Sequence, residues 1–201
     1  RSGVKFQTTD FFTPSRDLNA DDVIFSFERQ LKGDMAWNKY VNGAAWEYSD
    51  GMGFPDLIKG IEKVDDLTVK FVLSRPEAPF LADLGMDFAS IVSKEYADKL
   101  EADGKMEQLN QMPLGTGPYK FVAYQPDAVI RYAAHPDYFK GKQKIDDLVF
   151  AITTDASVRA QKLKAGECHI MPYPNAADVE GLKADPNLTV TQQEGLNVAY
   201  L

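Results

Sequence analysis

Residues 112–121 read Met-Pro-Leu-Gly-Thr-Gly-Pro-Tyr-Lys-Phe, and this stretch separates two parts of the chain that differ in character. Two prolines restrict the backbone on either side of two glycines, which are free to adopt positive φ angles. The pattern predicts a sharp turn that leads into a strand starting at Tyr119. A dinucleotide-binding loop would need a third glycine that opens a helix, so we interpret the stretch as a structural turn. We place a subdomain boundary here, between residues 1–112 and residues 113–201.

The composition indicates a chain that can bury a core and that carries net negative charge. Of the 201 residues, 44% are hydrophobic, and the formal net charge is -8. The longest apolar runs, such as residues 148–152, are far shorter than the roughly 18 residues of a membrane span. Nucleic acids and anionic membranes attract clustered lysine and arginine, which an acidic chain does not offer. We therefore expect no nucleic-acid partner and no direct membrane insertion.

Helix caps and residue alternation predict the elements of the first part. Asn19 is expected to cap a helix, with Asp21 and Asp22 in the first turn, where carboxylates meet the positive end of the helix dipole. We interpret this pair as part of the cap rather than as catalytic carboxylates. The other predicted elements are a strand at residues 4–6, a hairpin at 61–73, a short helix at 80–84, and a helix at 94–102 capped by Ser93.

Residues 37–54 are rich in both aromatic residues and glycine. The rings belong to Trp37, Tyr40, Trp46, Tyr48 and Phe54. Rings in glycine-punctuated loops often line pockets, because loops carry functional groups, but they also pack beneath loops as a small core. The spacing of these residues does not separate the two interpretations.

Asp87 is a carboxylate inside an otherwise apolar run, residues 86–92, which reads as a strand. Met86 and Phe88 flank it. An acid in such a run either serves a binding site or simply faces water at the end of a loop. Both interpretations stay open at this stage.

The second part of the chain is predicted to alternate between strands and helices. Residues 119–124 and 128–133 flank a Gln-Pro-Asp turn and predict a second hairpin. The strands expected after it are residues 148–152, 168–171 and 188–192, and the helices between them are residues 156–165 and 176–184. Such alternation implies a parallel core with right-handed crossovers. The predicted fold class is α/β (mixed α+β).

The sequence offers no recognisable catalytic or metal-binding constellation. His135 and His169 lack the spacing of a metal motif, and neither a nucleophile elbow nor a phosphate-binding loop is present. We expect no enzyme activity, no cofactor and no metal. Cys168 is the only cysteine, and such a residue is usually buried and inert. In an exported protein, however, an odd cysteine raises the question of a partner elsewhere.

Several segments in order along the chain resemble one family. They are residues 3–6, 18–29, 75–81, 115–119 and 145–167, together with residues 86–90, 155–159 and 171–174. The set resembles the extracellular solute-binding proteins, family 5, of bacterial ABC importers, and in particular its dipeptide-binding and haem-binding members. The resemblance implies the first lobe of a two-lobed, periplasmic-binding-protein-like (class II) fold, incomplete in this chain. Residues 1–112 would form the outer subdomain and residues 113–201 the hinge-proximal one, ending at the crossover to a second lobe.

The resemblance also implies a function. Proteins of this family capture a ligand in the periplasm and deliver it to a membrane permease, and a dipeptide or short peptide is the ligand expected here. Haem, glutathione or a metal chelate are alternatives, and an enzyme domain with an unrecognised site is the alternative from another class. The residues placed at the first-lobe wall of the binding cleft are Trp46, Tyr48, Met86, Asp87 and Phe88. Cys168 would pair with a cysteine outside the chain, since the periplasm is oxidising.

Overall fold

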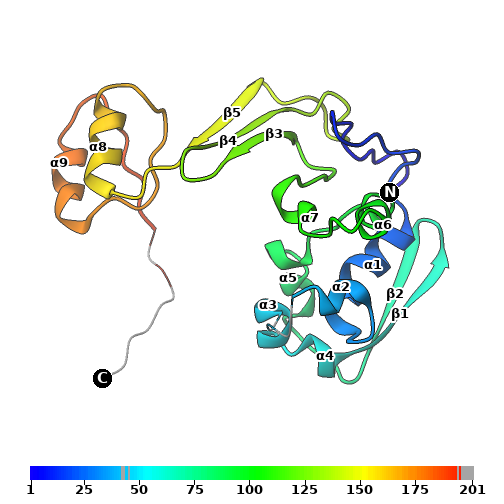
Figure 1. Ribbon diagram of the computed structural model, residues 1–201. Helices are drawn as coiled ribbons and strands as arrows, with labels where there is room; N and C mark the ends of the chain where they lie inside the picture. Colours follow the sequence, from blue (N-terminus) through cyan, green and yellow to red (C-terminus); the bar gives the residue numbers. More distant parts are fainter. Residues whose placement is uncertain (42–43, 45, 194, 196–201) are drawn as a thin grey trace. The chain divides into compact units, whose positions relative to one another are not determined.

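The computed structural model describes residues 1–41, 44, 46–193 and 195 (Figure 1). By their internal contacts the residues form two compact units. The first unit comprises residues 1–125 and 130–150, and the second comprises residues 126–129 and 151–201. The subdomain boundary between residues 112 and 113 stays a prediction.

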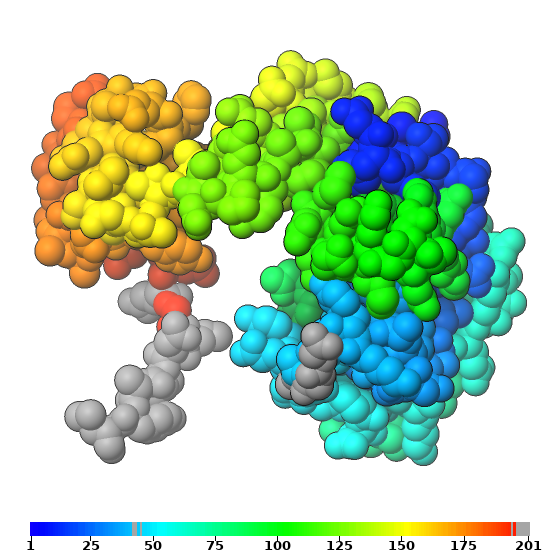
Figure 2. Space-filling model, in the orientation of Figure 1, coloured from blue at the N-terminus to red at the C-terminus, as the bar shows by residue number. Residues whose placement is uncertain are grey.

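Helix α1, Ala20–Leu31, is the central element of the first unit because it contributes to two hydrophobic clusters. Phe25 packs with Trp37 and Tyr96 in one cluster, and Phe27 packs with Phe54 and Phe80 in the other. Residues two positions apart point to nearly opposite sides of a helix, so one helix can hold both clusters together. In the space-filling view, the green segment around residues 100–115 lies against the blue segment around residues 25–40, as the first cluster requires (Figure 2).

Short helices surround α1. They are α2 Ala36–Lys39, α3 Glu47–Gly51, α4 Phe54–Leu57, α5 Phe80–Asp83, η1 Asp87–Ala89, α6 Lys94–Ala102 and α7 Gln108–Gln111. The predicted cap of α6 is confirmed, because the Ser93 side chain accepts a hydrogen bond from the backbone N–H of Tyr96 at 3.2 Å. The predicted cap of α1 is confirmed as well: Asn19 and Asp22 form a reciprocal capping box.

The predicted first hairpin is confirmed by β1, Ile58–Asp65, and β2, Thr68–Leu73, which pair antiparallel. Its turn is closed by Asp65, whose Oδ1 accepts a hydrogen bond from the backbone N–H of Leu67 at 2.8 Å. Local side-chain bonding of this kind is why Asp marks turns in sequences.

Two predicted strands of the first unit are wrong. Residues 4–6 belong to neither sheet of the described structure. The carbonyl of Val4 accepts a hydrogen bond from the backbone N–H of Leu18, in the loop before α1, at 2.8 Å. The run 86–92 contains the 3₁₀-helix η1 instead of a strand. The Asp87 carboxylate accepts a hydrogen bond from the next backbone N–H, that of Phe88, at 2.9 Å. This bond competes with a strand ladder and favours a helical turn.

The proline-bracketed turn leads into a strand as predicted, but neither Gly115 nor Gly117 has a positive φ angle. The turn is instead held by the buried side chain of Gln7. Its Nε2 donates to the carbonyls of Gly117 and Tyr119 at 3.1 and 2.7 Å, and its backbone N–H donates to the carbonyl of Gly115 at 2.9 Å. Contacts from more than a hundred residues away therefore set the turn geometry.

A three-stranded sheet follows the turn, in the order β3 Tyr119–Gln125, β4 Val129–Ala134 and β5 Asp147–Ala151. The second hairpin is thereby confirmed. The N–H of Ala134 donates to the carbonyl of Asp146, and the N–H of Ile152 donates to that of Ala128, so β5 also runs antiparallel to β4. Asp127, in the hairpin turn, has a φ angle of 59°.

The second unit contains α8 Ala156–Lys164, η2 Ala176–Asp178 and α9 Val179–Lys183. Helix α8 is capped by Asp155, whose side chain accepts from the N–H of Val158. The predicted parallel core is wrong for the described residues: 168–171 and 188–192 form no strand there. A strand needs a neighbour with which to exchange hydrogen bonds, and the described part of the chain places none beside these segments. The mixed α/β class is confirmed.

Candidate functional site

Two of the five predicted site residues meet in an aromatic stack. The rings of Tyr48 and Phe88 lie 6.2 Å apart at an interplanar angle of 15°. Phe88 in turn meets the ring of Phe54 edge-on, with centroids 5.2 Å apart. Phe54 is 1% exposed, whereas Tyr48 is 51% exposed. The stack therefore extends from the buried ring of Phe54 to the half-exposed ring of Tyr48, which a ligand can reach.

Trp46 is half-buried beneath a cation. The guanidinium carbon of Arg29 lies 5.2 Å from the centre of the Trp46 ring, within the range of a cation–π interaction. Burial lowers the pKa of Arg29 below the usual range of an arginine. Among the described residues, neither Arg29 Nε nor Trp46 Nε1 has a hydrogen-bond partner, although both atoms are buried. Trp46 thus stabilises a half-buried cation, a role that sequence reasoning did not assign to it.

Asp87 is exposed, and its carboxylate accepts the hydrogen bond from the backbone N–H of Phe88 described above. Met86, beside it, is half-buried. The placement of Asp87 fits the interpretation of an acid that faces water. Its negative charge nevertheless lies next to the aromatic stack, because Phe88 is the adjacent residue.

Of the aromatic residues in 37–54, some pack in the core and others lie at or near the surface, so each of the two interpretations, core packing and pocket lining, fits part of the run. Trp37 and Phe54 are each 1% exposed and belong to the core. Tyr48 lies at the surface, with Tyr40 and Trp46 between these extremes. The five predicted site residues Trp46, Tyr48, Met86, Asp87 and Phe88 are called the aromatic wall below, and of these Tyr48 and Asp87 are exposed. A groove of about 270 Å³ lies elsewhere, between α8 and the segment of η2 and α9, and is lined by Ser157, Ala160, Gly181 and Leu182 among others.

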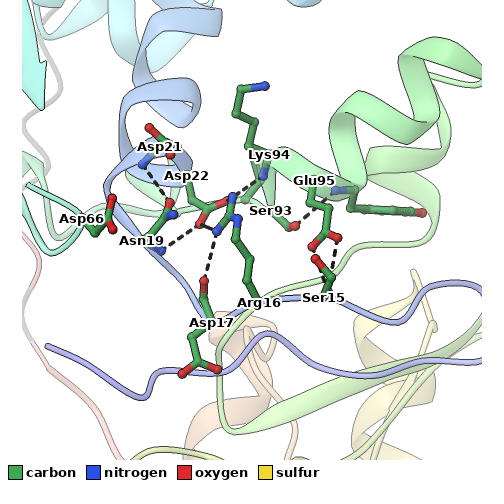
Figure 3. Close-up of polar contacts among 12 residues, drawn as sticks. Ser15, Arg16, Asp17, Asn19, Asp21, Asp22, Asp66, Ser93, Lys94 and Glu95 are labelled. Carbon is green, nitrogen blue, oxygen red and sulfur yellow. Dashed lines mark hydrogen bonds and ion pairs between the residues drawn. The ribbon is translucent and has the colours of Figure 1, made fainter.

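A buried polar network, which the sequence analysis did not predict in full, holds the first unit together (Figure 3). The carboxylate of Asp22 is fully buried and accepts from both terminal nitrogens of Arg16, at 2.6 and 3.0 Å. It also accepts from the backbone N–H groups of Asn19 and Lys94, at 2.9 and 2.8 Å. The hydrogen bond to Asp22 raises the pKa of Arg16 above its usual range. The spacing Asn19-x-x-Asp22 is that of a capping box and was the available signal.

The two carboxylates of the Asp21-Asp22 pair have different partners. Asp21 lies at the surface, where Lys63 donates to its two oxygens at 3.1 and 3.0 Å. Both acids are therefore used in structure, as the cap interpretation expected.

The two histidines and the cysteine differ in their burial and in their contacts. His135 is buried, with Nδ1 3.1 Å from the carbonyl of Gly117, so that it secures the proline-bracketed turn. His169 is exposed and Cys168 is a half-buried free thiol. Across the residues described, no group of three or more His, Cys, Asp or Glu side chains is arranged to hold a metal ion. Nor does that part of the chain contain a helix long and apolar enough to cross a membrane.

Comparison with known proteins finds relatives that are named for the ligands they bind. The chain is 55% identical to the di/tripeptide-binding protein 4 of Pseudomonas aeruginosa and 49% identical to the heme-binding protein A of Haemophilus influenzae. Each match covers 100% of this chain but only 38% and 37% of the respective relative.

Among solved structures, the chain is similar to a dipeptide-binding protein from Pseudoalteromonas sp. SM9913 in complex with Met-Leu. The TM-score is 0.87 at 38% identity, over 92% of this chain and 36% of the other. The chain thus spans less than two fifths of the length of the relatives it matches. A family model described as bacterial extracellular solute-binding proteins, family 5, middle part, matches residues 1–201, and the chain therefore belongs to this family.

Proposed function

We propose that this chain is part of the substrate-binding component of a bacterial ABC importer, and that the whole protein captures dipeptides or tripeptides in the periplasm and delivers them to a membrane permease. The observation that carries the proposal is the 55% identity, over the whole chain, to a di/tripeptide-binding protein. The similarity in fold to a relative in complex with Met-Leu supports it.

The aromatic wall is proposed as one side of the binding cleft. The exposed ring of Tyr48 offers flat apolar surface to a ligand side chain, and the stack with Phe88 and Phe54 fixes its position. Because Tyr48 and Asp87 are exposed, a ligand that contacts them would keep much of its hydration. Tight binding therefore requires a second surface that closes over the ligand, as expected of a two-lobed protein.

The division of the chain is part of the same proposal. Residues 1–112 would form the outer subdomain of the first lobe, and residues 113–201 the hinge-proximal subdomain. In the periplasm, Cys168 would form a disulfide with a cysteine outside these 201 residues, since that compartment permits disulfides.

Calorimetry on a full-length protein that carries this chain tests the proposed function. Titration with Met-Leu should release or absorb heat with saturation at one ligand per protein. An absence of binding to Met-Leu and to other dipeptides and tripeptides would contradict the proposal. The same samples should not hydrolyse the dipeptide, because we propose a binding protein and not an enzyme.

Haem is the second candidate ligand, favoured by the 49% identity to a haem-binding protein. An absorption spectrum of the protein with added haemin separates the two candidates. A shifted and saturable Soret band, together with no heat from dipeptides, would favour haem over peptides.

A further inference from the structure

The strand β5 has the sequence of an interior strand, yet it lies at the edge of its sheet. Residues 148–152 read Leu-Val-Phe-Ala-Ile, a continuous apolar run that is typical of a strand covered on both faces. In the sheet order β3-β4-β5, however, β5 has β4 on one side, and the described part of the chain places no strand on the other (Figure 1). The proposed function does not explain this mismatch.

The hydrogen-bond register shows which backbone groups of β5 face outward. The N–H of Ala134 donates to the carbonyl of Asp146 at 2.7 Å, so these two residues form a hydrogen-bonded pair between β4 and β5. Alternate residues of an antiparallel strand direct their N–H and carbonyl groups to the same side. The groups of Phe150 therefore point toward β4, and those of Asp147 and Val149 point away from it. No backbone group of another described element is bonded to the outward groups.

The side chains at this edge are apolar and exposed on both faces of the sheet. Val149, on one face, is 47% exposed, and Phe150, on the other, is 52% exposed. The ring of Phe150 meets that of Tyr132, on β4, with centroids 5.9 Å apart. Toward β4 the ring therefore has an aromatic neighbour of the kind that stabilises paired strands. Unpaired backbone groups beside exposed apolar side chains form a template for a further strand.

The β1–β2 hairpin also has edges, but it is protected in a way that β5 is not. Its strands carry the exposed residues Lys59, Lys63 and Lys70, and its register is irregular at two places. Lysine side chains and bulges are common devices that keep an edge from pairing with another strand. Residues 148–152 contain neither a charged residue nor a proline. The edge of β5 is therefore suited to pairing rather than to exposure.

From these observations we infer that β5 is an interior strand in the full-length protein, and that a strand from polypeptide outside these 201 residues pairs with its outer edge. The relatives have the length to supply it, since the chain covers less than two fifths of each. The partner strand should be apolar where it lies beside Val149 and Phe150, because neighbouring side chains on one face pack together. The inference does not depend on which ligand the protein binds.

Hydrogen–deuterium exchange, read at single amides by nuclear magnetic resonance, tests the inference in a full-length protein that carries this chain. Phe150 is the internal reference, because its N–H points toward β4 and is protected whether or not the outer edge is paired. If a strand covers the edge, the amide of Val149 should exchange within about tenfold of the rate of Phe150, after correction for sequence. A larger excess for Val149 shows a free edge and overturns the inference.

A pair of variants tests the same edge through its side chains. Val149→Lys places a charge at the outer edge of β5, and Val64→Lys is the matched control at a 60% exposed valine of β1. A paired edge removes the new lysine from water, which is unfavourable for a charge. Val149→Lys should therefore lower the melting temperature by several degrees, and Val64→Lys should leave it unchanged. Equal melting temperatures for the two variants would contradict a covered edge.

A second copy of the chain is the other possible source of the strand. Sedimentation and exchange measurements over a range of protein concentrations separate the two sources. If the strand belongs to the same polypeptide, the amide of Val149 stays protected in samples that sediment as monomers. Protection that disappears as a dimer dissociates would assign the edge to a second copy and overturn the inference.

Discussion

Removal of the Asp22 carboxylate should destabilise the protein more than any change to the exposed acid beside it. In Asp22→Ala, Arg16 loses its two hydrogen bonds to the carboxylate, and the backbone N–H groups of Asn19 and Lys94 lose their acceptor (Figure 3). These groups come from the loop before α1 and from the start of α6, so one side chain joins three segments. The substitution therefore breaks contacts that no neighbouring residue replaces.

The magnitude follows from the burial of the two partners. Removing one partner of a buried ion pair costs about 3–5 kcal/mol, because the remaining charge is left without compensation. Arg16 is 33% exposed, however, and water can reach it in the variant, whereas Asp22 is 0% exposed. We therefore expect the lower end of that range, about 3 kcal/mol, which is a large share of the roughly 5–15 kcal/mol that stabilises a typical domain.

Urea denaturation followed by far-ultraviolet circular dichroism measures the loss, in a full-length protein that carries this chain. Asp21→Ala is the matched control. Asp21 is the neighbouring acid on the same helix, but its side chain is 42% exposed and pairs with Lys63 at the surface. Such a pair contributes about 0–1 kcal/mol. Asp22→Asn should lose nearly as much as Asp22→Ala, because its amide would point a donor at other donors. Equal losses in Asp21→Ala and Asp22→Ala would refute the reasoning.

Three further predictions concern the aromatic wall, the cysteine and the turn. Tyr48→Ala should weaken Met-Leu binding by about tenfold without lowering the melting temperature, because the ring is half-exposed; unchanged affinity in calorimetry would leave the stack as packing. Mass spectrometry of the unreduced full-length protein should find Cys168 in a disulfide, and a free thiol there would defeat that pairing. Gln7→Ala should cost about 2 kcal/mol in urea denaturation, since it removes two hydrogen bonds to half-buried carbonyls of the turn. Gln143→Ala, at a half-buried surface loop position, should cost far less. Similar losses in the two glutamine variants would contradict the role of Gln7.

Elements whose determinants lie within a few residues were predictable from the sequence. The caps at Asn19, Ser93 and Asp155 and the two hairpins all depend on side chains close to the backbone groups that they satisfy. The predicted strand over residues 86–92 failed for the same kind of reason. Its hydrophobicity suited a strand, but the hydrogen bond that the Phe88 N–H donates to the Asp87 carboxylate favoured a helical turn.

The residues of the candidate site could be predicted from the sequence, but which of their side chains are exposed could not. The sequence located the rings of residues 37–54 and the acid at position 87, and it could not tell that Phe54 is buried and Tyr48 accessible. Exposure depends on which elements pack over a residue, and those elements come from distant parts of the chain.

The sequence by itself determined the capped helices, the hairpins, the mixed α/β class and the family, because periodicity, caps and ordered motifs are all local or collinear signals. Only the tertiary structure decided which acid is buried, how the proline-bracketed turn is held and which rings reach solvent. The carboxylate of Asp22 meets a backbone group 72 positions away, and Gln7 reaches carbonyls 110 and 112 positions away. Polar groups leave water only where such distant partners replace their hydrogen bonds, and the fold alone brings those partners together.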